Sequence, residues 1–87
     1  MRLINSLNNV DLPYDKIHIQ LTYQEKTDDA PECYKIEAGF INPVQDGDEI
    51  WILGAYSTFE KQLEAWGNLH KATLEGKELF IFPENDI

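Results

Sequence analysis

At 87 residues the chain has room for a single hydrophobic core, so we expect one globular domain that spans residues 1–87. Hydrophobic residues make up 43% of it and charged residues 26%, proportions that are typical of a folded protein and argue against intrinsic disorder. Sixteen acidic residues against seven basic ones give a net charge of −9, which disfavours direct binding to nucleic acids and anionic membranes, because both are bound through clusters of Lys and Arg.

Cysteine content and hydropathy indicate the compartment. Cys33 is the only cysteine, so no intramolecular disulfide can form, and small secreted domains usually depend on one. Residues 1–9 lack the apolar stretch of a signal peptide, and nowhere do ~18 apolar residues run consecutively. We therefore expect a cytoplasmic protein that does not enter a membrane.

The first part of the chain contains a helical pattern and then a strand pattern. Leu3, Leu7 and Val10 recur at helical spacing, which predicts a short amino-terminal helix. Residues 16–24 alternate apolar and polar side chains without exception, which predicts a strand with one buried face, whereas residues 25–32 have no period and predict a loop. The residues expected on the buried face of the strand are Ile17, Ile19, Leu21 and Tyr23.

A second alternating segment, residues 34–40, predicts another strand. The dipeptide Asp46-Gly47 is a strong signal for a tight type I′ turn, which would pair this strand with residues 49–56. Opposed positions in such a hairpin sum to 93, as 46 and 47 do, so Gly39 would face Gly54. The core side of the first strand would then carry Tyr34, Ile36, Ala38 and Phe40.

Residues 49–56 are apolar on both faces of the predicted strand. One face would join the core, and the other needs a cover, which could be the amino-terminal segment, a second copy of the chain or a partner protein. Two facing glycines would leave a flat patch there, where another backbone can approach closely. The candidate oligomer face comprises Gly39, Ile41, Ile50, Ile52 and Gly54.

A helix and a last strand complete the pattern. Residues 57–60 (Ser-Thr-Phe-Glu) fit a capping box, in which the first and last side chains bond each other's backbone amides, and Gly76 is placed to end the helix. Gly67 costs the helix ~1 kcal/mol relative to alanine and suggests close packing. Residues 79–82 predict a strand that joins the same sheet as its fourth member. The apolar stripe expected to face the sheet is Phe59, Leu63, Trp66, His70 and Leu74.

Together these elements predict an α+β fold: an antiparallel sheet of three to four strands, in the order strand-strand-strand-helix-strand, with one amphipathic helix packed on one face. The join at residues 53–58, Leu-Gly-Ala-Tyr-Ser-Thr, resembles the strand-to-helix join of small domains with three antiparallel strands and one helix. Plant ethylene-response DNA-binding domains and the arm-binding domains of phage tyrosine integrases are two such families. The resemblance implies the fold and not DNA binding, because those families read DNA with arginine-rich strand faces and no predicted strand here contains arginine.

Candidates for catalysis and metal binding are sparse. His18 and His70 are expected on a polar strand face and on the apolar helix stripe, and neither they nor Cys33 form a pattern with catalytic or metal-ligand spacing. We therefore expect no catalytic residue, no metal and no cofactor. The alternative is a small enzyme or ligand-binding domain, with a pocket near Trp51, Tyr56 and Trp66.

Carboxylates gather in two predicted loops at opposite ends of the sheet, and Asp11 and Asp15 are expected at the same end as the second loop. Such acidic poles can imitate duplex phosphates or neutralise a basic active site. The sequence thus predicts a non-enzymatic interaction protein that binds and inhibits a basic partner protein, as immunity proteins, antitoxins and phage inhibitors do. The alternatives are that the charge only confers solubility, or that the chain is a homo-oligomeric structural subunit. The predicted partner-binding residues are Glu25, Asp28, Asp29 and Glu32 in one loop and Asp46, Asp48 and Glu49 in the other.

Overall fold

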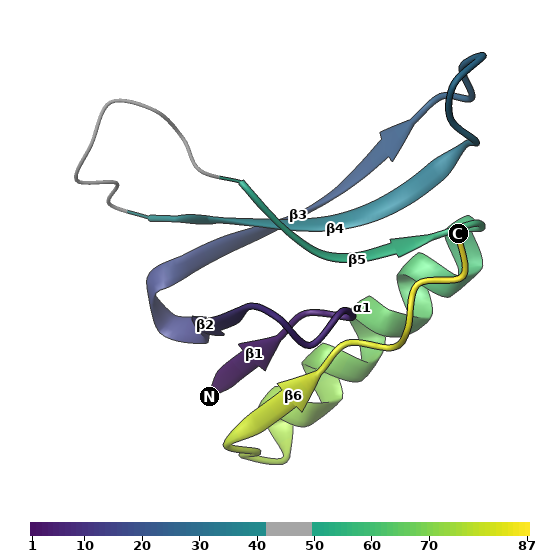
Figure 1. The fold of residues 1–87 in the computed structure, drawn as a ribbon. Helices are drawn as coiled ribbons and strands as arrows, with labels where there is room; N and C mark the ends of the chain where they lie inside the picture. The colour runs from purple at the N-terminus through teal and green to yellow at the C-terminus, as the bar shows by residue number, and fades with distance from the viewer. Residues whose placement is uncertain (42–49) are drawn as a thin grey trace.

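Two three-stranded sheets and one helix make up the computed structural model, which describes residues 1–41 and 50–87 (Figure 1). One sheet is antiparallel with the order β3-β4-β5, and the other has the order β2-β1-β6, with β6 parallel to β1. The predicted α+β class and three-stranded antiparallel sheet are confirmed. The elements are β1 (Arg2–Ile4), β2 (Asp11–Pro13), the 3-10 helix η1 (Tyr14–Lys16), β3 (Ile17–Gln24), β4 (Cys33–Phe40), β5 (Trp51–Tyr56), α1 (Phe59–Leu74) and β6 (Leu79–Ile81).

The β3–β4 hairpin follows the predicted alternation. Its eight paired positions run from Ile17 opposite Phe40 to Gln24 opposite Cys33, and the intervening residues 25–32 form the predicted loop. Directly opposed residues of an antiparallel pair share a face, so one face of this hairpin is apolar and points to the core.

The predicted register between β4 and β5 is wrong. Ile36, and not Gly39, lies opposite Gly54, and Ala38 lies opposite Trp51. Between these pairs the ladder shifts by one residue, so Leu53 is the extra residue of a β-bulge, which a pattern of pure alternation does not anticipate. The Asp46-Gly47 turn lies outside the described residues.

Because of the bulge, Gly54 does not form part of a flat glycine patch. It is buried, and a Cβ atom placed on it would overlap the ring of Tyr56. The Tyr56 ring is itself held in the interior, since its hydroxyl donates to the Pro83 carbonyl at 3.0 Å and its exposed fraction is 2%. Glycine at position 54 therefore makes room for an aromatic side chain of the same strand.

The predicted amino-terminal helix is wrong, because residues 2–13 form the β1–β2 hairpin. Its turn is organised by Asn5, whose side-chain oxygen accepts from the amides of Asn9 and Val10, each at 2.9 Å. Pairing places Leu3 opposite Leu12, and both are buried in the core. Of the residues whose spacing suggested a helix, Leu3 is buried in β1, whereas Leu7 lies in the turn and is 65% exposed.

Residues 79–82 supply the predicted strand, but in the second sheet. β6 pairs with β1 and does not add to the antiparallel sheet. Contrary to expectation, one strand contains an arginine, because Arg2 lies in β1. The Nε atom of Arg2 lies 2.8 Å from the Asp11 carboxylate of β2. Both residues are exposed, so this ion pair contributes little to stability.

The ends of α1 agree with the prediction at one terminus and differ by one residue at the other. Thr58, and not Ser57, is the N-cap, and its hydroxyl accepts from the Lys61 amide at 3.2 Å. At the carboxyl end Gly76 has φ 69°, a left-handed conformation that favours glycine, and Lys77 N donates to Ala72 O at 3.0 Å. This is the Schellman arrangement expected of a helix ended by glycine.

The predicted buried stripe of α1 is wrong. The residues that face the interior are Gln62, Ala65, Leu69 and Ala72, whereas Phe59 is 53% exposed and Leu74 88%. Gln62 is 2% exposed, and its Nε2 donates to Thr22 O at 3.0 Å and to Lys35 O at 2.8 Å. Because both hydrogen bonds of the side-chain amide are made to backbone carbonyls, burial of Gln62 costs less free energy than its polarity suggests.

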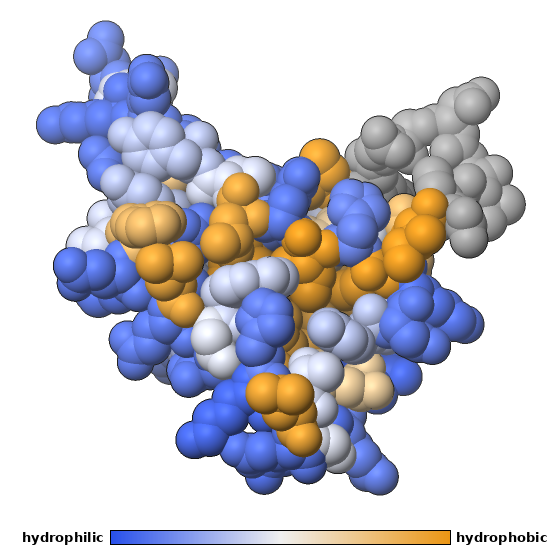
Figure 2. Space-filling view, turned by 180° about the vertical axis from the view of Figure 1, so that it is seen from behind, coloured by the Kyte–Doolittle hydropathy of each residue, from blue (hydrophilic) through white to orange (hydrophobic). Residues whose placement is uncertain are grey.

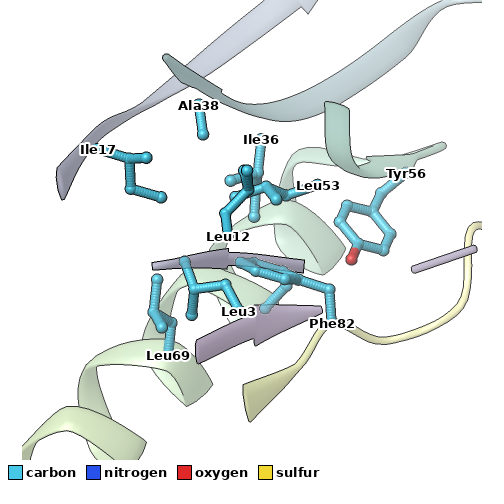
Figure 3. Close-up of a cluster of buried hydrophobic side chains, with 10 residues drawn as sticks. Leu3, Leu12, Ile17, Ile36, Ala38, Leu53, Tyr56, Leu69 and Phe82 are labelled. Carbon is cyan, nitrogen blue, oxygen red and sulfur yellow. The ribbon is translucent and has the colours of Figure 1, made fainter. Parts of the chain in front are cut away.

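The core lies between the two sheets and α1, and side chains from all three parts point toward one another (Figure 3). Leu3 and Ile36 are fully buried, and Phe82, which directly follows β6, is 2% exposed. The larger side chains that form this core are Leu3, Leu12, Ile17, Ile36, Leu53, Tyr56, Leu69 and Phe82.

The outer edge of β5 is covered by both ends of the chain. The Leu53 carbonyl at the bulge accepts from the Ser6 amide at 2.8 Å. On the carboxyl-terminal side, the Ala55 amide donates to Asn85 Oδ1 at 2.8 Å, and the Ser57 amide donates to Asp86 Oδ1 at 2.7 Å. Backbone groups that would otherwise lie bare at the sheet edge are thus paired.

Gly67 offers a direct stability test, since an added Cβ meets no atom within 4 Å and the predicted close packing is absent. We expect Gly67→Ala to raise the free energy of unfolding by about 1 kcal/mol in urea titrations, because alanine loses less backbone entropy in a helix. Gly76→Ala is the matched opposite, because its φ of 69° strains any residue with a Cβ, and it should lower stability. Equal effects of the two substitutions would contradict this account.

Candidate protein-binding surface

The loop between β3 and β4 carries four carboxylates at the tip of a hairpin that extends away from the second sheet and the lower part of α1 (Figure 1). The loop is closed by Thr27, whose amide donates to Ala30 O at 2.8 Å and whose hydroxyl accepts from Ala30 N at 3.1 Å. The ion pairs found within residues 1–41 and 50–87 involve none of the four, and the four carboxylates with Lys26 give residues 25–32 a net charge of −3. We define the acidic loop as the exposed residues Glu25, Asp28, Asp29 and Glu32.

The other predicted acidic group, Asp46, Asp48 and Glu49, lies outside the described residues. Two acidic poles were expected, and the structure describes one of them. Asp11, which the sequence also suggested for the second pole, is paired with Arg2 and so carries less free charge. The acidic loop at the β3–β4 end is therefore the predicted partner-binding group that lies within the described residues.

Next to the acidic loop lie aromatic side chains that are exposed in β3 and at the start of α1 and partly buried in β4. The rings of Tyr23 and Tyr34 are 4.9 Å apart between centroids, and those of Tyr34 and Phe59 are 6.1 Å apart. Leu63 extends the cluster by one helical turn and is 42% exposed, while Tyr23 and Phe59 are 52% and 53% exposed. We define the aromatic patch as Tyr23, Tyr34, Phe59 and Leu63.

Glu32 connects the acidic loop with the aromatic patch. Interaction with the Glu32 carboxylate, together with desolvation, raises the pKa of Tyr34. Desolvation and the charges of Glu32 and Glu25 raise the pKa of Tyr23. Both hydroxyls thus lie close enough to the Glu32 carboxylate to interact with it, which joins the aromatic residues to the acidic loop.

Sequence reasoning missed the aromatic patch because it assigned all four residues to the core. The stripe of Phe59, Leu63 and Trp66 is more hydrophobic than the stripe of Gln62, Ala65 and Leu69, yet the second one is buried. The available signal was size, since small residues at positions 65 and 72 let a helix approach a sheet closely. Hydrophobicity alone does not contain this information.

The predicted oligomer face is divided by the β-bulge. Ile41, Ile50 and Ile52 are 55%, 55% and 47% exposed, and the register puts Ile52 on the same side as buried Gly39, opposite Glu37. Gly54 lies on the other side, opposite Ile36. Seen from behind, hydrophobic side chains form a broken band across the middle of the molecule, below a hydrophilic lobe (Figure 2).

The groups considered for catalysis are dispersed. His18 pairs with Gly39 and Cys33 with Gln24, so six positions of the ladder, roughly 20 Å, separate the imidazole from the thiol. Burial raises the pKa of the Cys33 thiol, which lowers its reactivity. Within residues 1–41 and 50–87, no three His, Cys, Asp or Glu residues are grouped so that they could hold a metal ion.

His70 is held on the exposed side of α1 by its neighbour Trp66. Its Nδ1 lies 3.0 Å from the Trp66 carbonyl, and the two rings meet edge to face with centroids 4.4 Å apart. The side chain is exposed and does not pack in the core, contrary to its assignment to a buried stripe.

A hollow of 240 Å³ lies between the start of α1 and the carboxyl-terminal tail. Tyr56 borders it, whereas Trp51 and Trp66, which the sequence grouped with Tyr56, do not. Burial and the neighbouring Asp86 raise the pKa of Tyr56 to about 12. Asp86 accepts from Lys61 Nζ at 2.5 Å and from the Ser57 hydroxyl, so these two bonds hold the carboxyl-terminal tail against the start of α1.

No family model, no curated protein and no solved structure matches the chain. In the part of the chain that the structure describes, no helix has the length and apolarity needed to cross a bilayer.

Asp86 is expected to make stability depend on pH. Its bonds to Lys61 and Ser57 lower its pKa from 3.8 to about 2, so the stabilisation is complete above pH 3.8 and is lost as the pH falls toward 2. We predict that Asp86→Asn lowers the free energy of unfolding by about 1 kcal/mol at neutral pH and by less near pH 2. Urea titrations across this range will measure the difference.

The control is Asp29→Asn, which removes the same charge from an exposed loop position that takes part in none of the ion pairs of the described residues. It should leave the pH profile close to that of the parent protein. Parallel profiles for Asp86→Asn and the parent protein would contradict the role given to Asp86.

Proposed function

We propose that this protein is a non-enzymatic binding protein that docks a basic partner protein on the acidic loop and the adjoining aromatic patch. The observation that carries the proposal is the juxtaposition of the two features. Four carboxylates without an ion pair among the described residues stand beside aromatic rings that are about half exposed. One feature offers charge and the other offers apolar contact area.

Protein interfaces commonly combine these two contributions. Aromatic side chains at the centre of an interface supply most of the affinity, while charged residues at the rim steer the approach and select the partner. The net charge of −9 extends attraction for a basic protein beyond the contact itself, and repels polyanions. Tyr23, Tyr34 and Phe59 fit the central role, and the acidic loop fits the rim.

Inhibition is the functional consequence that we propose for this binding. A partner's basic surface is often the place where it holds a nucleic acid or another anionic substrate, so a tightly bound acidic hairpin would occlude it. We place this activity in the cytoplasm, in keeping with the free thiol of Cys33.

The proposal can be tested with a neutralised loop. The variant combines Glu25→Gln, Asp28→Asn, Asp29→Asn and Glu32→Gln, and the assay is retention of proteins from a native lysate over steps of salt. We expect the parent protein to retain a basic protein that elutes between low and moderate salt, and the variant to lose it, because screening weakens exposed charge pairs.

A control variant of equal charge separates a local effect from a general one. Glu60, Glu64, Glu78 and Glu84 are exposed and form none of the ion pairs found among the described residues, and changing all four to Gln also removes four negative charges. The control should retain the partner. Equal losses in both variants would show that net charge and not the acidic loop is responsible, and no salt-sensitive partner under any condition would refute the proposed function.

A further inference from the structure

β3 is the outer strand of its sheet, and its outer edge is bare. The strand pairs with β4 on one side, and among residues 1–41 and 50–87 no backbone hydrogen bond reaches it from the other side. No described element runs along the outer side of its carboxyl-terminal half (Figure 1). The opposite edge of the same sheet, on β5, is covered by Ser6, Asn85 and Asp86.

The backbone groups on this edge can be identified by residue. Ile41 N donates to Lys16 O at 3.0 Å, so even-numbered residues of this strand point their amides and carbonyls toward β4. The odd-numbered residues then point theirs outward, toward solvent. These residues are Ile17, Ile19, Leu21 and Tyr23.

The residues of β3 do nothing to protect this edge. Natural edge strands are usually blunted by a charged side chain, a proline or a bulge, and the eight residues of β3 contain no Asp, Glu, Lys, Arg or Pro and pair with β4 without a shift. The sequence has high β-propensity and no formal charge, which are the properties of a strand that accepts another strand. Ile19 and Leu21 are also only partly buried by the rest of the molecule.

We propose that β3 pairs with β3 of a second copy of the chain, in antiparallel orientation, to form one continuous six-stranded sheet across a two-fold axis. Antiparallel strands that share a core face must oppose residues of like parity, and a register centred on Gln20 satisfies this condition. It places Ile19 opposite Leu21 of the second copy, apolar against apolar, and His18 opposite Thr22, polar against polar.

Charge at this edge does not prevent the approach of a second copy, although the net charge of the chain is −9. The strand itself carries no formal charge, and the antiparallel arrangement sends the two acidic loops to opposite ends of the paired strands, roughly 27 Å apart for eight residues. That separation exceeds the Debye length of ~8 Å at physiological salt, so their repulsion is screened. In the same arrangement Lys16 of each copy lies opposite Gln24 of the other copy, and so next to Glu25 of that copy.

Sedimentation velocity from about 1 μM to about 1 mM protein tests the dimer, together with a charge swap at the axis. Gln20 is exposed and would face its own copy, so Gln20→Glu and Gln20→Lys should each weaken self-association about fivefold, while their equimolar mixture should restore it. Asn68→Asp makes the same charge change as Gln20→Glu on the exposed side of α1, and should leave association unchanged.

Amide hydrogen exchange gives a second test, because the dimer predicts that protection gained on association alternates between odd-numbered and even-numbered residues of β3. The amides of Ile19 and Leu21 should become protected as the protein concentration rises, whereas those of Gln20 and Thr22 should be protected at every concentration by pairing with β4. A monomer up to 1 mM with fast exchange at Ile19 and Leu21 overturns the proposal, as does a dimer that is insensitive to both Gln20 substitutions. A monomer whose odd-numbered amides are protected only by an added basic protein also overturns it, and assigns the edge to a partner strand.

Discussion

The fold depends on the way the outer edge of β5 is closed. The bulge at Leu53 turns one side chain into the core and one carbonyl outward, and the outward carbonyl accepts the amide of Ser6. From the other terminus, Asn85 Oδ1 accepts the amide of Ala55 and also the hydroxyl of Ser6. One short segment of β5 thereby joins the antiparallel sheet to both ends of the chain. Since those ends build the second sheet, the hydrogen bonds that close the β5 edge also fix the position of the second sheet.

Core packing decides which side of α1 is free. The helix packs with small residues and one buried glutamine, and Gln62 donates two hydrogen bonds to carbonyls of β3 and β4. With that side buried, Phe59 and Leu63 point away from the core and join Tyr34 next to the acidic loop. The candidate binding surface is therefore a consequence of core packing, and its apolar half is available because a less hydrophobic stripe fills the interior.

The two edges of the antiparallel sheet have opposite properties. β5 is covered by polar side chains from both termini, whereas β3 presents bare backbone groups and carries no formal charge. Covering an edge is one of the means by which proteins prevent strand addition, and among residues 1–41 and 50–87 it is found on the β5 side only. The distribution of charge follows the same division, since the carboxylates gather at the tip of the β3–β4 hairpin and leave the strand itself neutral.

Local patterns in the sequence determined the parts of the structure that depend on neighbouring residues. Strict alternation over residues 16–24 specified β3, and Gly76 ended α1 because only a residue without a Cβ tolerates its φ of 69° easily. The exposure of the acidic loop followed from its composition. What depended on distant residues could not be predicted: the bulge at Leu53 responds to the core it enters and to Ser6, and the rotation of α1 responds to carbonyls that accept from Gln62. Tertiary structure decided these features, because a packed interior selects side chains by shape and paired hydrogen bonds as well as by hydrophobicity.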